Sequence, residues 1–354
     1  MFKRPDGIPP VHLPAYARRT VEQAGADIAR GSANPSLCRV TGGSENAIMA
    51  ESFAAEQIRQ FSYQGYAFAC RILPCPAPVT EPIVVLCGAF QNIRSYHRYD
   101  RYWHDSATVI CMEPPGSYSP DPVPRTVGYG FDADALAYLL DELELPRINL
   151  LGVSLGAAPT HRFAQEYPER LARLMLTGAA WGDSARRGAG ELAHWLGLRR
   201  ADEFGRTMVE LCVNEDPTRT VRNRKAVRRA LLEHLSTASE AEMVRYLAVA
   251  QRLVDHPATL PGRISGIPTL CVTGEHDDLA PPGLARRMAA GIDGAAFTTI
   301  RETCHVSFLE RPADWADLVL RFFTDQPLDG LDYLSALEHP AGRLEHEETA
   351  SPGW

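Results

Sequence analysis

The sequence predicts an α/β protein with a doubly wound, mostly parallel sheet and an inserted helical segment. Three observations carry this prediction. Short apolar runs recur along the chain, amphipathic helical segments separate them, and a long stretch with helical spacing alone interrupts the alternation once. Runs that are apolar on both faces are typical of strands buried on both sides of a parallel sheet, which helices then cover.

The predicted strands begin with a hairpin. Phe61 and Tyr63 alternate with polar residues, Gln64 and Gly65 suit a two-residue turn, and the alternation resumes at Tyr66. This hairpin is expected at an edge of the sheet. The apolar runs that follow predict buried strands at 83–87, 107–112, 148–151, 174–177, 267–273 and 297–300.

Helical periodicity fills the intervals between these runs. Leucines recur at helical spacing after Asp132, and a second apolar pattern of this kind follows Pro312. The alternation stops between the predicted strands at 174–177 and 267–273, where the chain is rich in Ala, Leu, Glu and Arg. Residues 182–263 are therefore predicted as a helical cap over a site, and residues 57–181 and 264–325 as the α/β core.

The two ends of the chain lack this pattern. Residues 1–56 mix Pro, Gly, Ser and Asn and are predicted as an N-terminal extension. Residues 326–354 lose the helical periodicity and are predicted as a mobile C-terminal tail. Neither end contains an internal repeat or a low-complexity segment.

The composition is that of an ordinary globular protein. The 354 residues are 45% hydrophobic and 23% charged, with a formal net charge of -8. An acidic chain lacks the positive field that would hold nucleic acid or an anionic membrane. No segment approaches the run of about 18 apolar residues that a spanning helix needs, so a cytoplasmic location is expected. The cysteines form no CxxC pair, so neither a disulfide scaffold nor a metal site is predicted.

The strongest local signal surrounds Ser154. The segment GVSLG at 152–156 directly follows the predicted strand at 148–151 and precedes a helical segment. A serine in a tight strand-to-helix turn exposes its hydroxyl, and glycines two residues to either side let the turn close. The helix N-terminus then directs its NH groups toward a developing oxyanion. The pattern predicts Ser154 as a nucleophile, and the alternative is a serine that caps the helix.

In this context the chain resembles the α/β-hydrolase superfamily, over about residues 57–325. That family orders its triad as serine, acid and histidine along the chain. The segment GEHD at 274–277 resembles the acid turn, and CHVSFLERP at 304–312 resembles the histidine loop. The resemblance therefore implies a triad of Ser154, Asp277 and His305, with Asp278 and Asp183 as alternative acids.

These residue types also suit the chemistry by themselves. A serine hydroxyl is a poor nucleophile until a base removes its proton, and an imidazole does so near neutral pH. A carboxylate then fixes the tautomer of the imidazole and stabilises its protonated form. A hydrolase of this kind is expected to use neither a metal nor an organic cofactor.

The resemblance also implies an oxyanion hole made of two backbone NH groups. One belongs to Leu155, the residue after the candidate nucleophile. The other comes from the loop after the strand at 83–87, where the family commonly has H-G-x and this chain has CGAF. Ala89 is the first choice and Phe90 the second. Phe90 and Trp181 are also predicted to line the substrate pocket, with plain packing as the alternative for Trp181.

The expected function is hydrolysis of a carboxylic ester or thioester through an acyl-serine intermediate. Acyl transfer and carbon–carbon bond hydrolysis stay as alternatives, as does a non-catalytic ligand receptor on the same fold. The expected partner is a small acyl substrate, free or attached to a carrier protein; oligomeric state is not predicted. A basic cluster in the predicted cap would suit an acidic carrier, although such a run is more often a solvated helix face. The cluster comprises Arg219, Arg222, Arg224, Lys225, Arg228 and Arg229.

Overall fold

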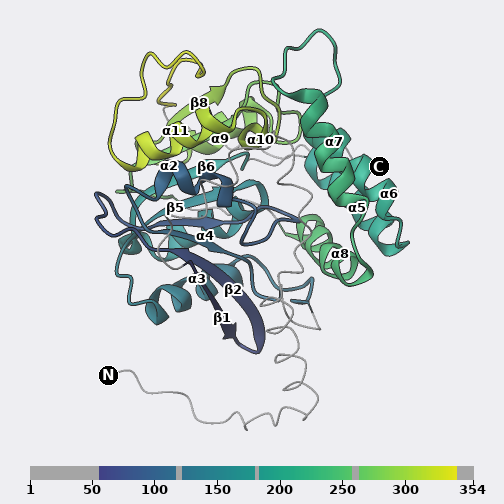
Figure 1. Ribbon diagram of the computed structural model, residues 1–354, viewed down its shortest axis with the longest axis horizontal. Helices are drawn as coiled ribbons and strands as arrows, with labels where there is room; N and C mark the ends of the chain where they lie inside the picture. The colour runs from purple at the N-terminus through teal and green to yellow at the C-terminus, as the bar shows by residue number, and fades with distance from the viewer. Residues whose placement is uncertain (1–55, 117–121, 180–182, 257–262, 341–354) are drawn as a thin grey trace, which may run out of the picture. The chain divides into compact units, whose positions relative to one another are not determined.

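The computed structural model describes residues 56–116, 122–179, 183–256 and 263–340. Within these residues the chain forms a sheet of eight strands in the order β1-β2-β4-β3-β5-β6-β7-β8 (Figure 1). β2 is antiparallel to both of its neighbours, and the other neighbouring pairs are parallel. The predicted class, a doubly wound and mostly parallel sheet, is confirmed. The strands are β1 (Gln57–Tyr63), β2 (Tyr66–Leu73), β3 (Ile83–Leu86), β4 (Val109–Met112), β5 (Ile148–Val153), β6 (Leu171–Thr177), β7 (Thr269–Gly274) and β8 (Ala296–Ile300).

The edge hairpin forms where the sequence predicts it. Phe61 of β1 pairs with Phe68 of β2, and the two rings stack with their centroids 5.7 Å apart. Between the strands, Gln64 and Gly65 have positive φ angles of 48° and 90°. A two-residue turn with positive φ at both positions matches the twist of the strands it joins, so the local sequence determines this hairpin.

Helices cover both faces of the sheet. They are α2 (Asp100–Trp103), α3 (Gly130–Glu142), α4 (Ala157–Glu166), α9 (Pro282–Ala290), α10 (Ser307–Glu310) and α11 (Pro312–Phe323). In β3, Val84 and Leu86 join a hydrophobic cluster with α3, α4 and α9, whereas Ile83 and Val85 join a second cluster with α2 and α11. Because successive strand residues point to opposite faces, a continuous apolar run requires a helical layer on each side.

The chain between β6 and β7 is helical in its described part. Its helices lie to the right of the sheet in Figure 1, and we call residues 183–255 the cap. They are α5 (Asp183–Gly197), α6 (Ala201–Cys212), α7 (Arg224–Leu235) and α8 (Glu240–Asp255). Leu196, Phe204 and Ala250 belong to a hydrophobic cluster that the cap helices share. α8 begins with a capping box between Ser239 and Glu242, which satisfies the free NH groups of its first turn.

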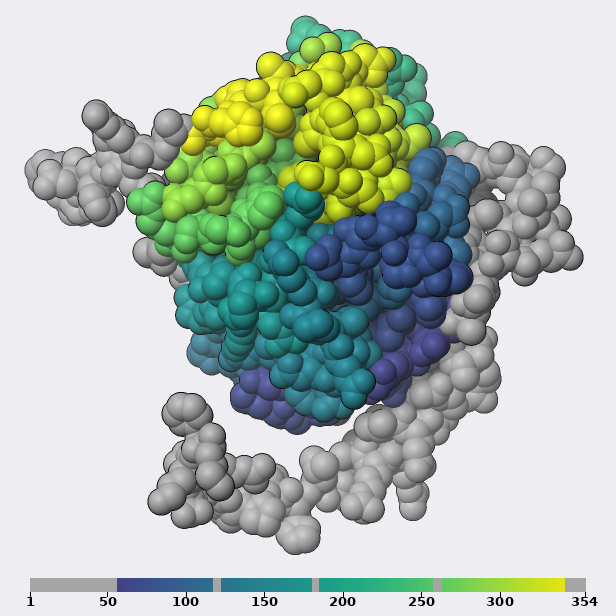
Figure 2. All heavy atoms as spheres, turned by 90° about the vertical axis from the view of Figure 1, so that its left-hand side faces the viewer, coloured from purple at the N-terminus to yellow at the C-terminus, as the bar shows by residue number. Residues whose placement is uncertain are grey.

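The prediction of a mobile tail is wrong for residues 326–340. Phe297 and Ile300 of β8 form isolated antiparallel bridges with Glu338 and Leu334, and Leu334 is buried. The carboxylate of Glu338 also binds Arg286 of α9 at 2.6 and 2.9 Å. Figure 2 shows the yellow C-terminal residues beside the green segment that carries α9. Residues 326–340 pair with β8 through single bridges and not through a continuous strand. Isolated contacts of this kind do not require apolar residues at regular intervals, so the sequence shows no periodic pattern here.

Some predictions concern residues outside the described part of the chain. The N-terminal extension, except for Glu56 at its boundary, belongs to this group, as do Trp181 and the tail beyond residue 340. Among the helices that are described, none is long and apolar enough to cross a membrane.

Candidate active site

Ser154 lies in the tight turn between β5 and α4. Its φ angle is 50°, in the left-handed region that is unfavourable for a residue with a side chain. The flanking glycines let other groups come close. A Cβ on Gly156 would lie 2.2 Å from the carbonyl oxygen of Leu86, and one on Gly152 would lie 2.6 Å from Oγ1 of Thr160. A side chain at either position would force its neighbours to move, so the turn depends on both glycines.

Three side chains from separate loops meet at this turn. Oγ of Ser154 lies 2.8 Å from Nε2 of His305, and Nδ1 of His305 lies 2.9 Å from Oδ2 of Asp277. The three residues follow β5, β7 and β8, so each lies beyond the carboxyl end of a parallel strand. These ends meet along one edge of a doubly wound sheet, which brings residues 151 positions apart into contact.

The carboxylate of Asp277 is held by several donors besides His305. Its Oδ1 accepts hydrogen bonds from the backbone N–H of Leu279 at 2.9 Å and of Ala280 at 2.7 Å. Its Oδ2 accepts one from the hydroxyl of Thr273 at 2.8 Å. Asp277 is 1% exposed. These bonds fix the orientation of the carboxylate, and with it the orientation of the imidazole that it contacts.

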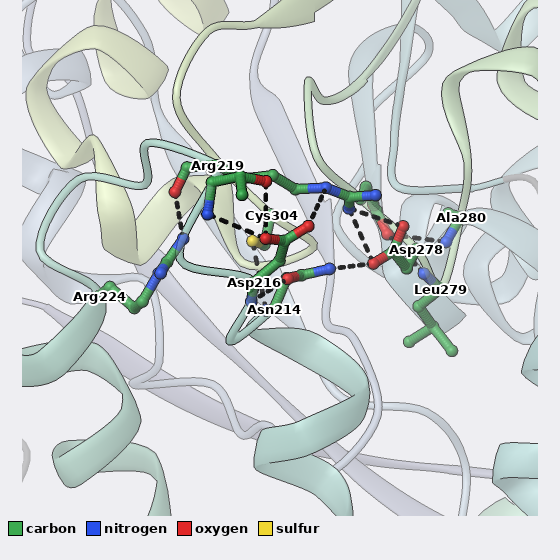
Figure 3. Close-up of polar contacts among 10 residues, drawn as sticks. Asn214, Asp216, Arg219, Arg224, Asp278, Leu279, Ala280 and Cys304 are labelled. Atoms are coloured by element: carbon green, nitrogen blue, oxygen red, sulfur yellow. Dashed lines mark hydrogen bonds and ion pairs between the residues drawn. The ribbon is translucent and has the colours of Figure 1, made fainter.

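Asp278, one of the two alternative acids, contacts the cap instead (Figure 3). Its carboxylate accepts hydrogen bonds from Arg219 at 2.9 and 3.0 Å and from the side-chain amide of Asn214. The side chain of Asp278 is 58% exposed. Successive residues of this turn therefore serve different partners, because Asp277 binds the imidazole and Asp278 binds the loop between α6 and α7. The side chain of Asp183, the other alternative, lies outside the described part of the structure.

Two buried groups set the electrostatics around the imidazole. Burial disfavours the protonated form of His305. The carboxylate of Asp277, with a further contribution from Glu310, stabilises that form more than burial destabilises it, so the pKa of His305 lies above its usual value. Glu310 is fully buried, and its Oε2 accepts a hydrogen bond from the backbone N–H of Cys304 at 2.6 Å. Burial raises the pKa of Glu310 to about 8.

Sequence reasoning assigned no role to Glu310. The residue lies inside the segment predicted as the histidine loop, between apolar neighbours and Arg311. The signal that could have indicated a role for Glu310 is a carboxyl group in an otherwise apolar stretch, because such groups are rarely buried without a specific partner. Its bond to Cys304, the residue before His305, makes Glu310 a positioning residue for that loop.

A pocket lies beside Ser154, and its empty volume of about 420 Å³ includes space that is open to solvent. Its walls are largely apolar, and the cap helices α5, α6 and α8 contribute one side of it. The apolar lining includes Ala189, Leu192, Met208, Leu211, Leu253 and Leu279. A pocket with such apolar walls suits the hydrocarbon part of a small substrate.

The residues expected to stabilise an oxyanion line the same cavity. Ala89 and Leu155 both border it next to Ser154. The loop before Ala89 is held by Gln91, whose Oε1 accepts a hydrogen bond from the backbone N–H of Gly88 at 2.6 Å. The structure thus brings these residues together although Ala89 and Leu155 follow different strands.

Phe90 connects the loop after β3 to the cap. Its φ angle is 62°, and its ring packs edge-on against Phe204 and Tyr246 of the cap with centroids 5.0 and 4.9 Å apart. Phe90 also lines the cavity beside Ser154. The second residue predicted for the pocket wall, Trp181, is outside the described residues.

Most of the basic cluster in the cap is already engaged with acceptors. The contacts are the ion pairs Arg219–Asp278, Arg222–Glu302 and Arg228–Glu215, and a hydrogen bond from Arg224 to the carbonyl oxygen of Arg219. Lys225 and Arg229 are exposed. The cluster therefore offers less free positive charge than its sequence suggests, and docking of an acidic carrier stays a prediction.

The comparisons with known proteins concern the family and the fold of the chain. The family model of the alpha/beta hydrolase fold matches residues 81–312. A 2-hydroxy-6-oxononadienedioate/2-hydroxy-6-oxononatrienedioate hydrolase from Escherichia coli is 26% identical over 267 residues, which cover 68% of this chain and 86% of that protein.

Two solved structures share the fold. An alpha/beta hydrolase enzyme from a Medee basin deep-sea metagenome library has a TM-score of 0.64 at 18% identity, covering 77% of this chain and 99% of that one. A thermophilic esterase from Thermogutta terrifontis has a TM-score of 0.61 at 21% identity, with the same coverage of 77% and 99%. The match of the family model over most of the core places this chain in the alpha/beta hydrolase fold family.

Proposed function

We propose that this chain is a serine hydrolase that cleaves a carboxylic ester or a thioester through an acyl-Ser154 intermediate. The observation that carries the proposal is the line of hydrogen bonds from Ser154 to His305, 2.8 Å, and from His305 to Asp277, 2.9 Å. Both distances fall within the range of about 2.6 to 3.2 Å that proton transfer and orientation require. The apolar cavity beside Ser154 supports a small acyl substrate with a hydrocarbon part.

In the first half of the proposed reaction, Nε2 of His305 takes the proton of Ser154 as Oγ attacks the carbonyl carbon. Asp277 holds the Nδ1–H of the imidazole and stabilises its positive charge. The carbonyl oxygen becomes an oxyanion that accepts hydrogen bonds from the backbone N–H groups of Leu155 and Ala89. His305 then gives its proton to the leaving alcohol or thiol, the ester bond breaks, and the acyl group stays on Oγ.

In the second half, water replaces the alcohol or thiol. His305 removes one proton from this water while the water oxygen adds to the acyl carbon. The backbone N–H groups of Leu155 and Ala89 again donate hydrogen bonds to the oxyanion. The proton then passes from His305 to Oγ of Ser154 as the acyl–oxygen bond breaks. The carboxylic acid leaves and the serine is restored, so each step uses side chains of this chain and water.

Carbon–carbon bond hydrolysis is a second candidate, favoured by the likeness to the Escherichia coli hydrolase at 26% identity. The compound in its name is an oxo diacid without an ester linkage, so its hydrolysis breaks a carbon–carbon bond. Ser154, His305 and Asp277 would act in either reaction. The two reactions differ in the leaving group. In carbon–carbon bond hydrolysis the leaving group is a carbon atom, and this carbon must receive the proton.

The experiment that tests the proposal combines labelling with turnover. A fluorophosphonate probe should label Ser154, located by mass mapping, and the Ser154→Ala variant should not be labelled. The unlabelled enzyme is then assayed on p-nitrophenyl esters and acyl thioesters of graded chain length and on an oxo dienoate diacid. Turnover of an ester or thioester that Ser154→Ala abolishes supports the proposal. Turnover of the diacid alone favours the second candidate, and labelling without turnover of any substrate contradicts both.

A further inference from the structure

The loop after β3 forms a tight turn beside the candidate nucleophile. The backbone N–H of Gln91 donates a hydrogen bond to the carbonyl oxygen of Gly88 at 3.4 Å. A Cβ on Gly88 would lie 3.1 Å from the carbonyl oxygen of Val153, the residue before Ser154. The loop therefore packs directly against the nucleophile turn, and its next residue, Ala89, lines the pocket beside Ser154.

The hydrogen bond from Gln91 fixes the orientation of the peptide unit that joins Gly88 to Ala89. This bond is trans, and the C=O and N–H of a planar trans peptide point in opposite directions. The C=O of the unit points toward the backbone N–H of Gln91, so the N–H of Ala89 points away from Gln91. The N–H of Ala89 is the second donor of the proposed oxyanion hole, and its direction thus depends on residue 91.

The side chain of Gln91 holds the peptide unit on the other side of Gly88. Its Oε1 accepts hydrogen bonds from the backbone N–H of Gly88 and from the hydroxyl of Tyr96, both at 2.6 Å. A backbone N–H can only donate, so the amide atom that faces it is the oxygen. Glycine has the widest choice of backbone angles, and contacts on both flanking peptide units restrict this choice at Gly88.

Tyr96 is fully buried and holds the amide of Gln91 from the protein interior. Its ring packs against the rings of Phe308 in α10 and Trp315 in α11, with centroids 5.9 and 6.1 Å away. Burial raises the pKa of Tyr96, so its hydroxyl stays protonated and donates to Gln91. This hydrogen bond connects the loop after β3 to the hydrophobic cluster on one face of the sheet.

We propose that Gln91, held by Tyr96, is a positioning residue for the oxyanion hole, and that it directs the backbone N–H of Ala89 toward the carbonyl oxygen of the substrate. The proposal rests on the proposed function, because it assumes acyl transfer to Ser154. A donor that is fixed in place before the reaction stabilises the developing oxyanion more than the neutral carbonyl group. Gln91 therefore acts on kcat and leaves KM nearly unchanged.

The test compares a ligand that forms an oxyanion with one that does not. With an alkyl trifluoromethyl ketone, Oγ of Ser154 adds to the carbonyl carbon, the serine proton passes to His305, and the carbonyl oxygen becomes an oxyanion. The alkyl methyl ketone of equal chain length binds without this addition. The inhibition constants of both ketones are measured with kcat and KM for the best p-nitrophenyl ester. Gln91→Met removes the acceptor at similar size, and Tyr96→Phe removes one donor to it.

Two control variants separate positioning from plain stability. Tyr99 is also fully buried and packs against Trp315, but its hydroxyl donates to the carbonyl oxygen of Phe308 in α10 instead of to the loop after β3. Tyr99→Phe therefore removes a buried hydrogen bond from the same aromatic cluster. Gln60→Met makes the same replacement as Gln91→Met at an exposed position of β1. Thermal unfolding of each variant measures its stability.

We expect Gln91→Met to lower both kcat and the affinity for the trifluoromethyl ketone by about tenfold to a hundredfold, less than the loss of a whole oxyanion donor causes. KM and the affinity for the methyl ketone should change by less than about threefold. Tyr96→Phe should lower kcat by about threefold to tenfold alone, but by less than about twofold when added to Gln91→Met, because it acts through Gln91. The two control variants should change kcat by less than about twofold.

Two failures are distinguishable. If no ester or thioester is hydrolysed in a Ser154-dependent way, the proposed function itself fails. If esters are hydrolysed but Gln91→Met weakens both ketones alike, or raises KM with kcat unchanged, the proposed function stands and Gln91 does not position the oxyanion hole. The same conclusion follows if Tyr99→Phe lowers kcat as much as Tyr96→Phe, and this comparison decides alone if Gln91→Met does not fold.

Discussion

The backbone N–H of His305 donates a hydrogen bond to the carbonyl oxygen of Cys212 at 3.1 Å. Cys212 is the last residue of α6, so the cap contacts the backbone of the candidate base directly. In the loop that follows, the backbone N–H of Asn214 donates to Sγ of Cys304 at 3.4 Å (Figure 3). The position of His305 therefore depends on the cap as well as on β8, and a movement of α6 would also move the imidazole.

The two adjacent carboxylates should differ sharply in their effect on catalysis. Asp277→Asn should lower kcat by about ten-thousandfold, because an amide favours the wrong tautomer of His305. Asp278→Asn should cost less than about tenfold, since its side chain binds Arg219 at an exposed position. Steady-state kinetics on the best ester measures both. A larger loss in Asp278→Asn than in Asp277→Asn would reverse the assignment of the acid.

Gly156, two residues after the candidate nucleophile, should not tolerate a side chain without loss of stability. In Gly156→Ala the new Cβ would lie 2.2 Å from the carbonyl oxygen of Leu86, so we expect a loss of about 3 kcal/mol or more in the free energy of unfolding. Gly190→Ala is the matched control. Gly190 lies inside α5, and a Cβ at this position would meet no atom within 4 Å, so the change should stabilise the protein by up to about 1 kcal/mol. Urea unfolding of both variants checks the pair, and equal stabilities would contradict the prediction.

The rate of ester hydrolysis should depend on the protonation of His305. A protonated imidazole cannot accept the proton of Ser154, so kcat/KM should fall as the pH drops through the pKa of His305. The pKa of His305 is raised, because Asp277 outweighs the effect of burial, and the midpoint of this fall should lie above the ordinary value of about 6.5. A pH–rate profile gives the midpoint, and NMR titration of His305 in Ser154→Ala gives an independent value. A midpoint below the ordinary value in both would refute the prediction.

The buried Glu310 should make stability fall as pH rises. Its pKa is about 8 in the folded state and close to the ordinary value of about 4.3 in the unfolded chain, so the folded state binds the proton more tightly. This contribution to stability is complete below the unfolded pKa and is lost as the pH rises through the folded pKa, by at most about 1.4 kcal/mol per pH unit.

Glu310→Gln removes this titration. We expect its stability relative to the unmodified protein to increase between about pH 5 and about pH 8.5, measured by urea unfolding. The control Glu233→Gln changes an exposed carboxylate, and its relative stability should stay constant over that range. A pH-independent difference for Glu310→Gln would mean that the carboxyl of Glu310 titrates normally in the fold.

Removing one partner of the ion pair between Arg252 and Asp132 should lower the free energy of unfolding more than replacing both partners. Arg252→Met leaves the carboxylate of Asp132 buried without its partner, which should cost about 3 to 5 kcal/mol. The double variant Arg252→Met, Asp132→Leu replaces both charges with apolar groups and should recover most of this loss. A double-mutant cycle of unfolding free energies provides the measurement. If the double variant is no more stable than Arg252→Met, the unpaired carboxylate is not the cause.

Local patterns in the sequence were sufficient for the fold class and for most of its elements. The strand predicted at 148–151 forms the first part of β5, and the hairpin turn at Gln64 and Gly65 forms as expected. Apolar runs and positive-φ turn residues act over a few neighbouring positions, so a short stretch of sequence reveals them. The turn around Ser154 is local in the same sense. Its glycines stand two residues to either side of the serine, and the close approach they allow requires them there.

Only the tertiary structure decided which side chains meet. Asp277 and Asp278 are adjacent in the sequence, which left Asp278 as an alternative acid. In the structure one contacts His305 and the other Arg219, because the path of the turn after β7 points successive residues to different neighbours. The burial of Glu310 depends equally on long-range packing, as do the bridges of residues 334 and 338 to β8. Contacts of this kind join positions that no short sequence window contains, and their geometry is set by the packing of the whole sheet with its helices.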